Sequence, residues 1–172
     1  MAAARERGAS EAAVWVAGVA GTERRARTVS AERGPSPPLS IGQVAAAVDA
    51  GRDLAAAAAA DGVAVLIASA PGGDDTAREL LAALAGDPSR PLRALRARGT
   101  HELAVLCGIA LGAGERGLGC VCDGLAAVAG AAVAAAIEPP LHARLRALTD
   151  HAQAARLGIA AVDSTELGAA LD

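Results

Sequence analysis

The feature that most constrains the fold is a short apolar run, followed by a glycine-containing polar turn and an alanine-rich stretch. It occurs twice. Residues 63–68, VAVLIA, precede the turn SAPGGDD, and residues 118–122, LGCVC, precede Asp123 and Gly124. Short runs that are apolar throughout are typical of parallel strands covered on both faces. Strands that alternate with helical stretches predict an α/β fold with a mostly parallel sheet and helices on both faces.

Local signals predict the other elements. Strands are expected at 12–21 (centred on 14–19), 63–68, 118–122 and, more weakly, 157–163. Helices are expected at about 41–60, 76–85, 101–114, 124–137 and 141–149. Ser40 and Thr100 are the expected N-caps of two of these helices, because their hydroxyls can accept from the first free amides. Polar or proline-rich composition predicts loops at 22–38, 69–75 and 87–99.

The apolar content is unusual in kind. Hydrophobic residues make up 53% of the chain but aromatic residues only 1%, with Trp15 alone. A core of alanine, valine, leucine and isoleucine must bring its backbones close together, because no large side chains fill the gaps. The stretch 124–137 has small residues on every face and is therefore predicted to be buried, in part against a second subunit.

The charge and the length of the chain argue against several classes of protein. The chain has 172 residues, which favours one domain over 1–172, and its net charge is −3, which argues against nucleic-acid binding. The arginines form two groups, at 24, 25 and 27 and at 90, 93, 96 and 98. A solvated surface is the expected role of each group, with an anion site as the alternative.

The apolar run 125–137 is shorter than the ~20 residues that cross a membrane. No secretory signal is visible, so a cytoplasmic protein is expected.

The three cysteines, Cys107, Cys120 and Cys122, lack the spacing of a metal site and are expected to be small buried hydrophobes. No metal or cofactor is predicted.

Two polar turns are expected to meet. Ligands of open parallel sheets bind at the carboxyl ends of the strands. The turn at 69–76 and the Asp123–Gly124 turn both follow predicted parallel strands, so both should lie at one edge of the sheet. The alternative is that each turn only connects a strand to a helix, with Asp123 as a helix cap.

Residues 99–145, GTHELAVLCGIALGAGERGLGCVCDGLAAVAGAAVAAAIEPPLHARL, resemble one family. The nicotinate-nucleotide:dimethylbenzimidazole phosphoribosyltransferases of cobalamin lower-ligand synthesis run Gly-Gly-x-acidic, a helix with Gly-x-x-x-Gly-Ala-Ala, and a strand ending in Asp-Gly. The counterparts here are Gly99 to Glu102, Gly108 to Gly114, and Val121 to Gly124. Upstream, VAVLIASAPGGDDT is similar to the family's strand and Gly-Glu-Met-Gly-x-Gly-Asn-Thr-Thr loop, and VWVAGVAG is similar to its first strand. The resemblance spans about 12–150.

The resemblance implies a Rossmann-like three-layer sandwich and a pentosyltransferase. The family's reaction moves the phosphoribosyl group of nicotinate mononucleotide to 5,6-dimethylbenzimidazole, which gives α-ribazole 5′-phosphate and nicotinate. A carboxylate takes the azole proton, and glycine-rich backbone holds the phosphate. The implied partners are therefore the nucleotide, a benzimidazole-type base and a second copy of the chain as a homodimer. The implied substrate-binding residues are Gly72, Gly73, Thr76, Gly99, Glu102, Asp123 and Gly124.

The chain also departs from the family pattern. Its loop lacks the family's glutamate and carries Asp74 and Asp75, which are expected to repel a nucleotide. Near the C-terminus, Thr165 falls on the family's catalytic glutamate, so the neighbouring Glu166 is the candidate base. His151 is matched to a family histidine or is a surface residue.

The family's N-terminal third, with its Asp-His-Gly motif, has no counterpart here. These departures describe a shortened, divergent member of low activity. The alternative is a catalytically degenerate relative that acts as a binding or partner subunit.

Overall fold

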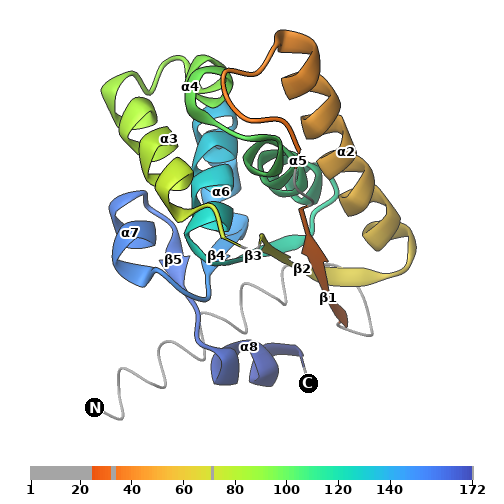
Figure 1. Ribbon diagram of the computed structural model, residues 1–172. Coiled ribbons are helices and arrows are strands. Elements are labelled where there is room, and N and C mark those ends of the chain that lie inside the picture. The colour runs from red at the N-terminus through yellow and green to blue at the C-terminus, as the bar shows by residue number, and fades with distance from the viewer. Residues whose placement is uncertain (1–24, 32–33, 71, 172) are drawn as a thin grey trace.

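The computed structural model describes residues 25–31, 34–70 and 72–171 and contains a five-stranded parallel sheet packed against helices (Figure 1). Each strand pairs in parallel with the next strand along the chain. The strands are β1 (Arg25–Ser30), β2 (Val63–Ser69), β3 (Gly119–Asp123), β4 (Leu145–Ala147) and β5 (Ala160–Ala161). The predicted α/β class with a parallel sheet is confirmed.

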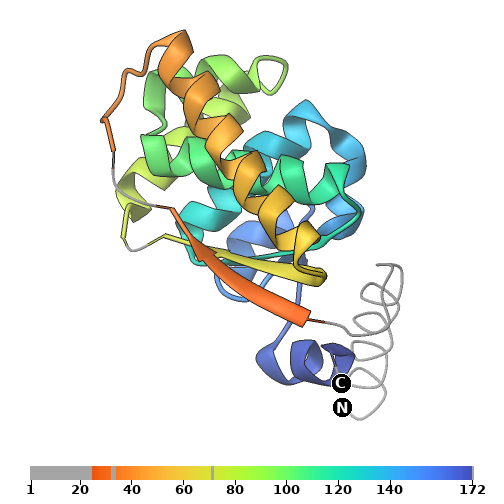
Figure 2. The ribbon, with the colours of Figure 1, turned by 90° about the vertical axis from the view of Figure 1, so that its right-hand side faces the viewer.

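Most helices cover one face of the sheet. The helices are α2 (Ile41–Ala60), α3 (Asp74–Gly86), α4 (Pro91–Arg98), α5 (His101–Glu115), α6 (Leu125–Ile137), the 3₁₀ helix η1 (Pro139–Arg144), α7 (His151–Arg156) and α8 (Ser164–Leu171). Crossovers between parallel strands are right-handed, so strands that follow one another in space place their connecting helices on the same face. Figures 1 and 2 show α2 to α6 on that face and α8 on the other.

The first described strand was not expected. The predicted strand at 12–21 lies outside the described residues, and the predicted loop at 22–38 contains β1. Among the described residues, β1 lies at the edge of the sheet and pairs with β2 alone, so it does not need a continuous apolar run. Its residues 26–28 and Ser30 are exposed, and Val29 packs against the core. An exposed edge strand of this kind has the composition of a loop.

Three further predictions were wrong in detail. The predicted loop at 87–99 contains α4, which begins at Pro91 and buries Ala94 and Leu95. Proline is well suited to the first position of a helix, because its missing N–H has no partner there anyway. The predicted helix at 141–149 is instead η1 followed by β4, and the predicted strand at 157–163 is shortened to β5, Ala160–Ala161. Short helices and strands contain too few residues to show a clear hydrophobic period in the sequence.

The expected N-caps are confirmed. The Ser40 hydroxyl accepts from the Gln43 amide at 3.1 Å, and the Gln43 side chain accepts from the Ser40 amide at 2.8 Å. This reciprocal pair is a capping box. The Thr100 hydroxyl accepts from the Leu103 amide at 3.4 Å at the start of α5. No helix in the described part of the chain is both long enough and apolar enough to cross a membrane.

Glycines bring α5 into backbone contact with α2. A Cβ at Gly51 would lie 2.7 Å from the Ile109 nitrogen, and one at Gly108 would lie 2.8 Å from the Val48 carbonyl carbon. A Cβ at Gly112 would lie 2.9 Å from the Arg52 Cα. Real Cβ atoms do not approach other atoms this closely, so the two helices touch only because these side chains are absent. The close approach of backbones expected from the composition is confirmed.

Helix α6 packs on the other side of α5. A Cβ at Gly130 would lie 3.0 Å from the Cys107 nitrogen, and every residue from Leu125 to Ala135 is buried. The predicted burial of this helix is therefore confirmed within one chain, and the contribution of a second subunit stays a prediction.

Gly51→Ala is expected to lower the free energy of unfolding by about 3 kcal/mol, since the added methyl must displace backbone atoms of α5. Gly42→Ala in the same helix is the matched control. Its Cβ would meet only the Ser40 Oγ, at 4.0 Å, and alanine favours helix over glycine, so it should be neutral or slightly stabilising. Urea unfolding followed by circular dichroism measures both, and equal effects would contradict the close contact.

The three cysteines are free and buried, as expected. Burial raises the pKa of the Cys107 thiol from its ordinary value of 9.0 to about 12. A hydrogen bond with the Cys120 thiol, together with burial, raises the pKa of Cys122 well above that value. In the described part of the chain, no group of three or more histidine, cysteine or acidic residues could hold a metal ion.

These thiols predict a loss of stability at alkaline pH. The unfolded chain ionises them above pH 9.0 whereas folded Cys107 keeps its proton up to about pH 12. Their contribution is therefore complete below pH 9.0 and is lost as the pH rises toward 12, by up to about 1.4 kcal/mol per pH unit and thiol. The chain has no tyrosine, and all 16 of its basic residues are arginine, so few other groups titrate there. Urea midpoints against pH should fall less steeply for Cys107→Ala than for the unaltered chain, and identical slopes would contradict the assignment.

Candidate functional site

The two predicted turns lie at the same edge of the sheet. In the β2–β3 pair, Ser69 lies opposite Asp123, so the carboxyl ends of both strands are side by side. The loop after β2 leads into α3, and Gly124 leads directly into α6. The predicted placement of these turns at one edge is confirmed.

A pocket of about 220 Å³ opens at this edge, where three helices begin. Its walls come from the β2–α3 loop and the first turns of α3, α5 and α6. The lining residues are Ala70, Gly72, Gly73, Thr76, Thr100, Glu102, Leu103 and Ala126. Four of the seven substrate-binding residues implied by the family resemblance, Gly72, Gly73, Thr76 and Glu102, are thus gathered around one space.

The glycine turn exposes backbone to the pocket. Gly72 and Gly73 have φ values of 79° and 89°, in the left-handed region that favours glycine. Gly73 is the N-cap of α3 and supplies no side chain to cap it. The first amides of a helix have no partner within the helix, so those of α3 are open to an external acceptor. An anionic group suits such a position, because the helix dipole also favours negative charge there.

Asp74 and Asp75 turn away from the pocket. Both carboxylates pair with Arg78, at 4.0 Å and 2.9 Å, and the Asp75 side chain is 99% exposed. Neither residue is part of the pocket lining. The two charges are exposed and are partly offset by the cation of Arg78, and their repulsion of a nucleotide stays a prediction.

Among the described residues that line the pocket, Glu102 is the one with a carboxylate. Its Oε2 is buried and has no hydrogen-bond partner in the described part of the chain. A buried acceptor without a donor typically costs about 1–3 kcal/mol. Its place in the first turn of α5 partly offsets this cost through the helix dipole. Glu102 thus contributes a carboxylate to the pocket lining, and one of its oxygens has no hydrogen-bond partner among the described residues.

The Asp123–Gly124 turn is held by a side chain from the segment after β4. The Gly124 amide donates to the Thr149 hydroxyl at 2.5 Å, and that hydroxyl donates to the Asp123 carboxylate at 3.3 Å. Gly124 has a φ of 91°, which explains glycine at this seam between strand and helix. Neither residue lines the pocket, although Ala126 does. Asp123 and Gly124 thus form a turn at this edge of the sheet without contributing to the pocket lining.

Gly99 is a packing residue. A Cβ there would lie 2.5 Å from the Leu95 carbonyl oxygen, and the residue is buried at the junction of α4 and α5. It does not line the pocket. Its neighbour Thr100 does, and the sequence identified Thr100 only as a helix cap.

Glu166 lies on the other side of the sheet. Its carboxylate accepts from the Asp163 amide at 3.1 Å, and the Asp163 carboxylate accepts from the Glu166 amide at 2.7 Å. This capping box starts α8, whose Leu167 packs with Val65 and Val121 on the face opposite α2 to α6 (Figure 1). The sheet separates Glu166 from the pocket. His151 is exposed, and its Nε2 lies 2.9 Å from the Leu148 carbonyl oxygen.

Comparisons with known proteins agree with this arrangement. The fold defines an α/β protein with a pocket at the carboxyl ends of its parallel strands, the edge where open parallel sheets typically bind ligands. A family model described as "Phosphoribosyltransferase" matches residues 74–167. The chain therefore belongs to the nicotinate-nucleotide:dimethylbenzimidazole phosphoribosyltransferase family.

Two solved structures are similar to the chain. The nicotinate-nucleotide-dimethylbenzimidazole phosphoribosyltransferase from Thermus thermophilus shares 25% identity, with a TM-score of 0.66 over 78% of this chain and 57% of its own. A structure described as CobT from the same organism also shares 25% identity, with a TM-score of 0.65 over 79% and 56%. The chain thus spans little more than half the length of these proteins. No curated protein matches it.

Thr149→Val is expected to destabilise the Asp123–Gly124 turn, because the Gly124 amide and the Asp123 carboxylate lose a shared hydroxyl. The free energy of unfolding should fall by about 1 kcal/mol, and the Gly124 amide should exchange with solvent faster. Thr149→Ser keeps the hydroxyl and is the control. Hydrogen exchange by NMR measures the local effect, and unchanged Gly124 exchange in Thr149→Val would show that the hydroxyl does not hold the turn.

Proposed function

We propose that the chain transfers the phosphoribosyl group of nicotinate mononucleotide to a benzimidazole-type base, with 5,6-dimethylbenzimidazole as the expected acceptor. Family membership supports this class of reaction. The observation that carries the proposal is the pocket, whose lining combines a glycine turn at the start of α3 with Glu102.

The pocket suits the two substrates in different ways. Its volume of about 220 Å³ is below the ~300–1,000 Å³ of sites that enclose a drug-sized ligand, so it would enclose only part of the substrate pair. The amides at the start of α3 would bind the phosphate of the nucleotide. Leu103 and Ala126 offer apolar surface to the azole base. The remainder of the nucleotide would extend beyond the pocket toward Asp123.

In the proposed mechanism, Glu102 receives the proton of the azole. The azole nitrogen with the lone pair attacks the anomeric carbon of the ribose. The bond from that carbon to the pyridine nitrogen breaks, and its electron pair leaves with nicotinate. The proton on the other azole nitrogen passes to the carboxylate of Glu102. General-base assistance of this kind is typically worth about 10²–10⁴ in rate.

A second candidate function is a binding or partner subunit without turnover. Two observations favour it. The family's loop glutamate has no counterpart in residues 69–76. Glu166, the candidate base next to Thr165, caps α8 on the far side of the sheet. A chain that holds a substrate and leaves the chemistry to another subunit would show the same pocket.

Formation of α-ribazole phosphate from the two substrates, followed by chromatography, tests the proposal. Glu102→Gln should lower the rate by about 10²–10⁴, while dimethylbenzimidazole still binds in calorimetry. Glu138→Gln, an exposed glutamate outside the pocket, should leave the rate unchanged. Glu166→Gln is compared in parallel. Loss of turnover in Glu166→Gln alone would place the base on α8, and binding without any turnover in the unaltered chain would favour the partner subunit.

A further inference from the structure

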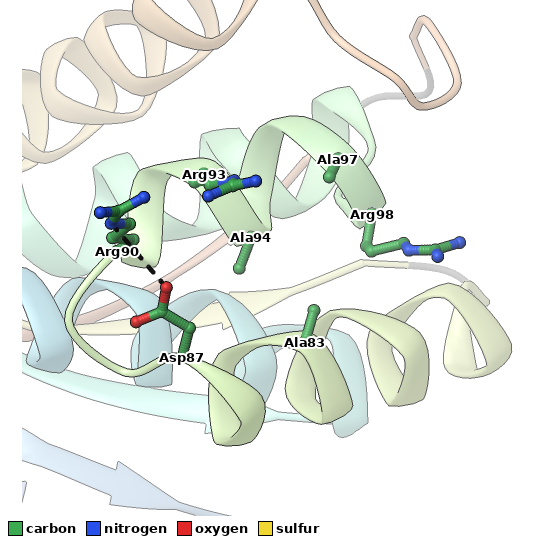
Figure 3. A pocket seen from close by; sticks show the side chains of 7 residues that line it. All are labelled: Ala83, Asp87, Arg90, Arg93, Ala94, Ala97 and Arg98. Atoms are coloured by element: carbon green, nitrogen blue, oxygen red, sulfur yellow. Dashed lines mark ion pairs between the residues drawn. The ribbon is translucent and has the colours of Figure 1, made fainter.

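A groove of about 330 Å³ lies between α3 and α4, outside the pocket described above. Figure 3 shows Arg90 next to Asp87 at one end and Arg98 at the other end, with Arg93 between them along α4. The side chains of Ala83 on α3 and Ala94 on α4 point toward each other, and Ala97 also lines the groove. None of these residues lines the pocket at the sheet edge.

The positive charge of the groove is only partly neutralised. The Asp87–Arg90 ion pair has a separation of 3.9 Å, and the Glu79–Arg98 pair one of 3.8 Å. Both distances are longer than a hydrogen bond, and all four side chains are about half exposed or more. Arg93 forms no ion pair within the described part of the chain. With three arginines and one aspartate, the lining has a surplus of positive charge.

The positive charge of the groove contributes to a lowered pKa of Asp87. A hydrogen bond from the Ser89 hydroxyl, at 2.6 Å, lowers the pKa of the Asp87 carboxyl, and the charges of Arg90 and Arg93 lower it further. Both arginines thus contribute positive charge around Asp87.

The floor of the groove is apolar. The three alanines fill little of the space between α3 and α4, so a flat or compact body can lie against them. The volume of 330 Å³ is within the range of small-molecule sites, about 300–1,000 Å³.

We propose that this α3–α4 groove binds a small phosphorylated molecule, with its phosphate on Arg90 and Arg93 and its ring on the alanine floor. Guanidinium groups bind phosphate through paired, charge-assisted hydrogen bonds, which makes arginine better suited than a point charge to this role. The loose Asp87–Arg90 pair yields to a phosphate without loss of a direct hydrogen bond. Arg98 is placed for a second polar group at the far end. The site is separate from the pocket of the proposed reaction.

The test uses AMP as the probe and adenosine as its uncharged counterpart, in ¹⁵N-edited NMR titrations of the full chain. AMP should shift the amides of residues 87–98, and adenosine should bind at least about tenfold more weakly because it lacks the phosphate. Arg93→Gln should weaken AMP binding about tenfold. Arg96→Gln removes the same charge from an exposed position of α4 outside the groove, and should change it by less than about twofold.

Equal losses in Arg93→Gln and Arg96→Gln would overturn the proposal, because they would show diffuse attraction to a basic helix. Shifts confined to residues 72–76 and 100–103 would also overturn it and would place the nucleotide in the edge pocket instead. Tighter binding of a single-stranded oligonucleotide than of AMP would replace the small molecule with a polymer. Arg93 is exposed, so Arg93→Gln should keep the fold, and circular dichroism checks this.

Discussion

The backbone contact between α2 and α5 sets the position of the elements around it. Gly51, Gly108 and Gly112 let the two helices touch, and Gly130 lets α6 approach α5 from the other side. The first turn of α5 carries Thr100, Glu102 and Leu103, and the first turn of α6 carries Ala126, so the same contacts place two walls of the pocket. In a chain with 1% aromatic residues, close backbones take the place of large side chains in the core.

The inner strands could be predicted from the sequence, whereas the outer ones could not. Residues of β2 and β3 are buried between layers, and this burial requires a continuous apolar run. The edge strand β1 faces solvent, and β4 and β5 have three residues and two. Their pairing depends on neighbours that are distant in the chain. The sequence did not predict helix α4, because its proline and arginines are typical of a loop. The helix buries Ala94 and Leu95, and two buried residues give no clear hydrophobic period.

The candidate site was predicted in part. The resemblance to a family pointed to Gly72, Gly73, Thr76 and Glu102, and the fold brings these residues around one pocket. It could not show that Asp74 and Asp75 turn outward to Arg78, because side-chain direction depends on the rotation of α3. For Glu166 a local signal existed, since Asp-x-x-Glu is the pattern of a capping box. The resemblance to the family instead favoured Glu166 as a candidate base, because it lies next to the position of the family's catalytic glutamate.

The order of the strands in space is also their order in the chain, from β1 at one edge to β5 at the other. A chain that emerges from the ribosome N-terminus first can therefore add each new strand to an edge that already exists. No described strand has to be inserted between two others, as it must be in sheets whose strand order reverses. Assembly can thus keep pace with synthesis, and the growing sheet offers its newest edge to the next strand of the same chain, which limits the surface open to wrong pairing.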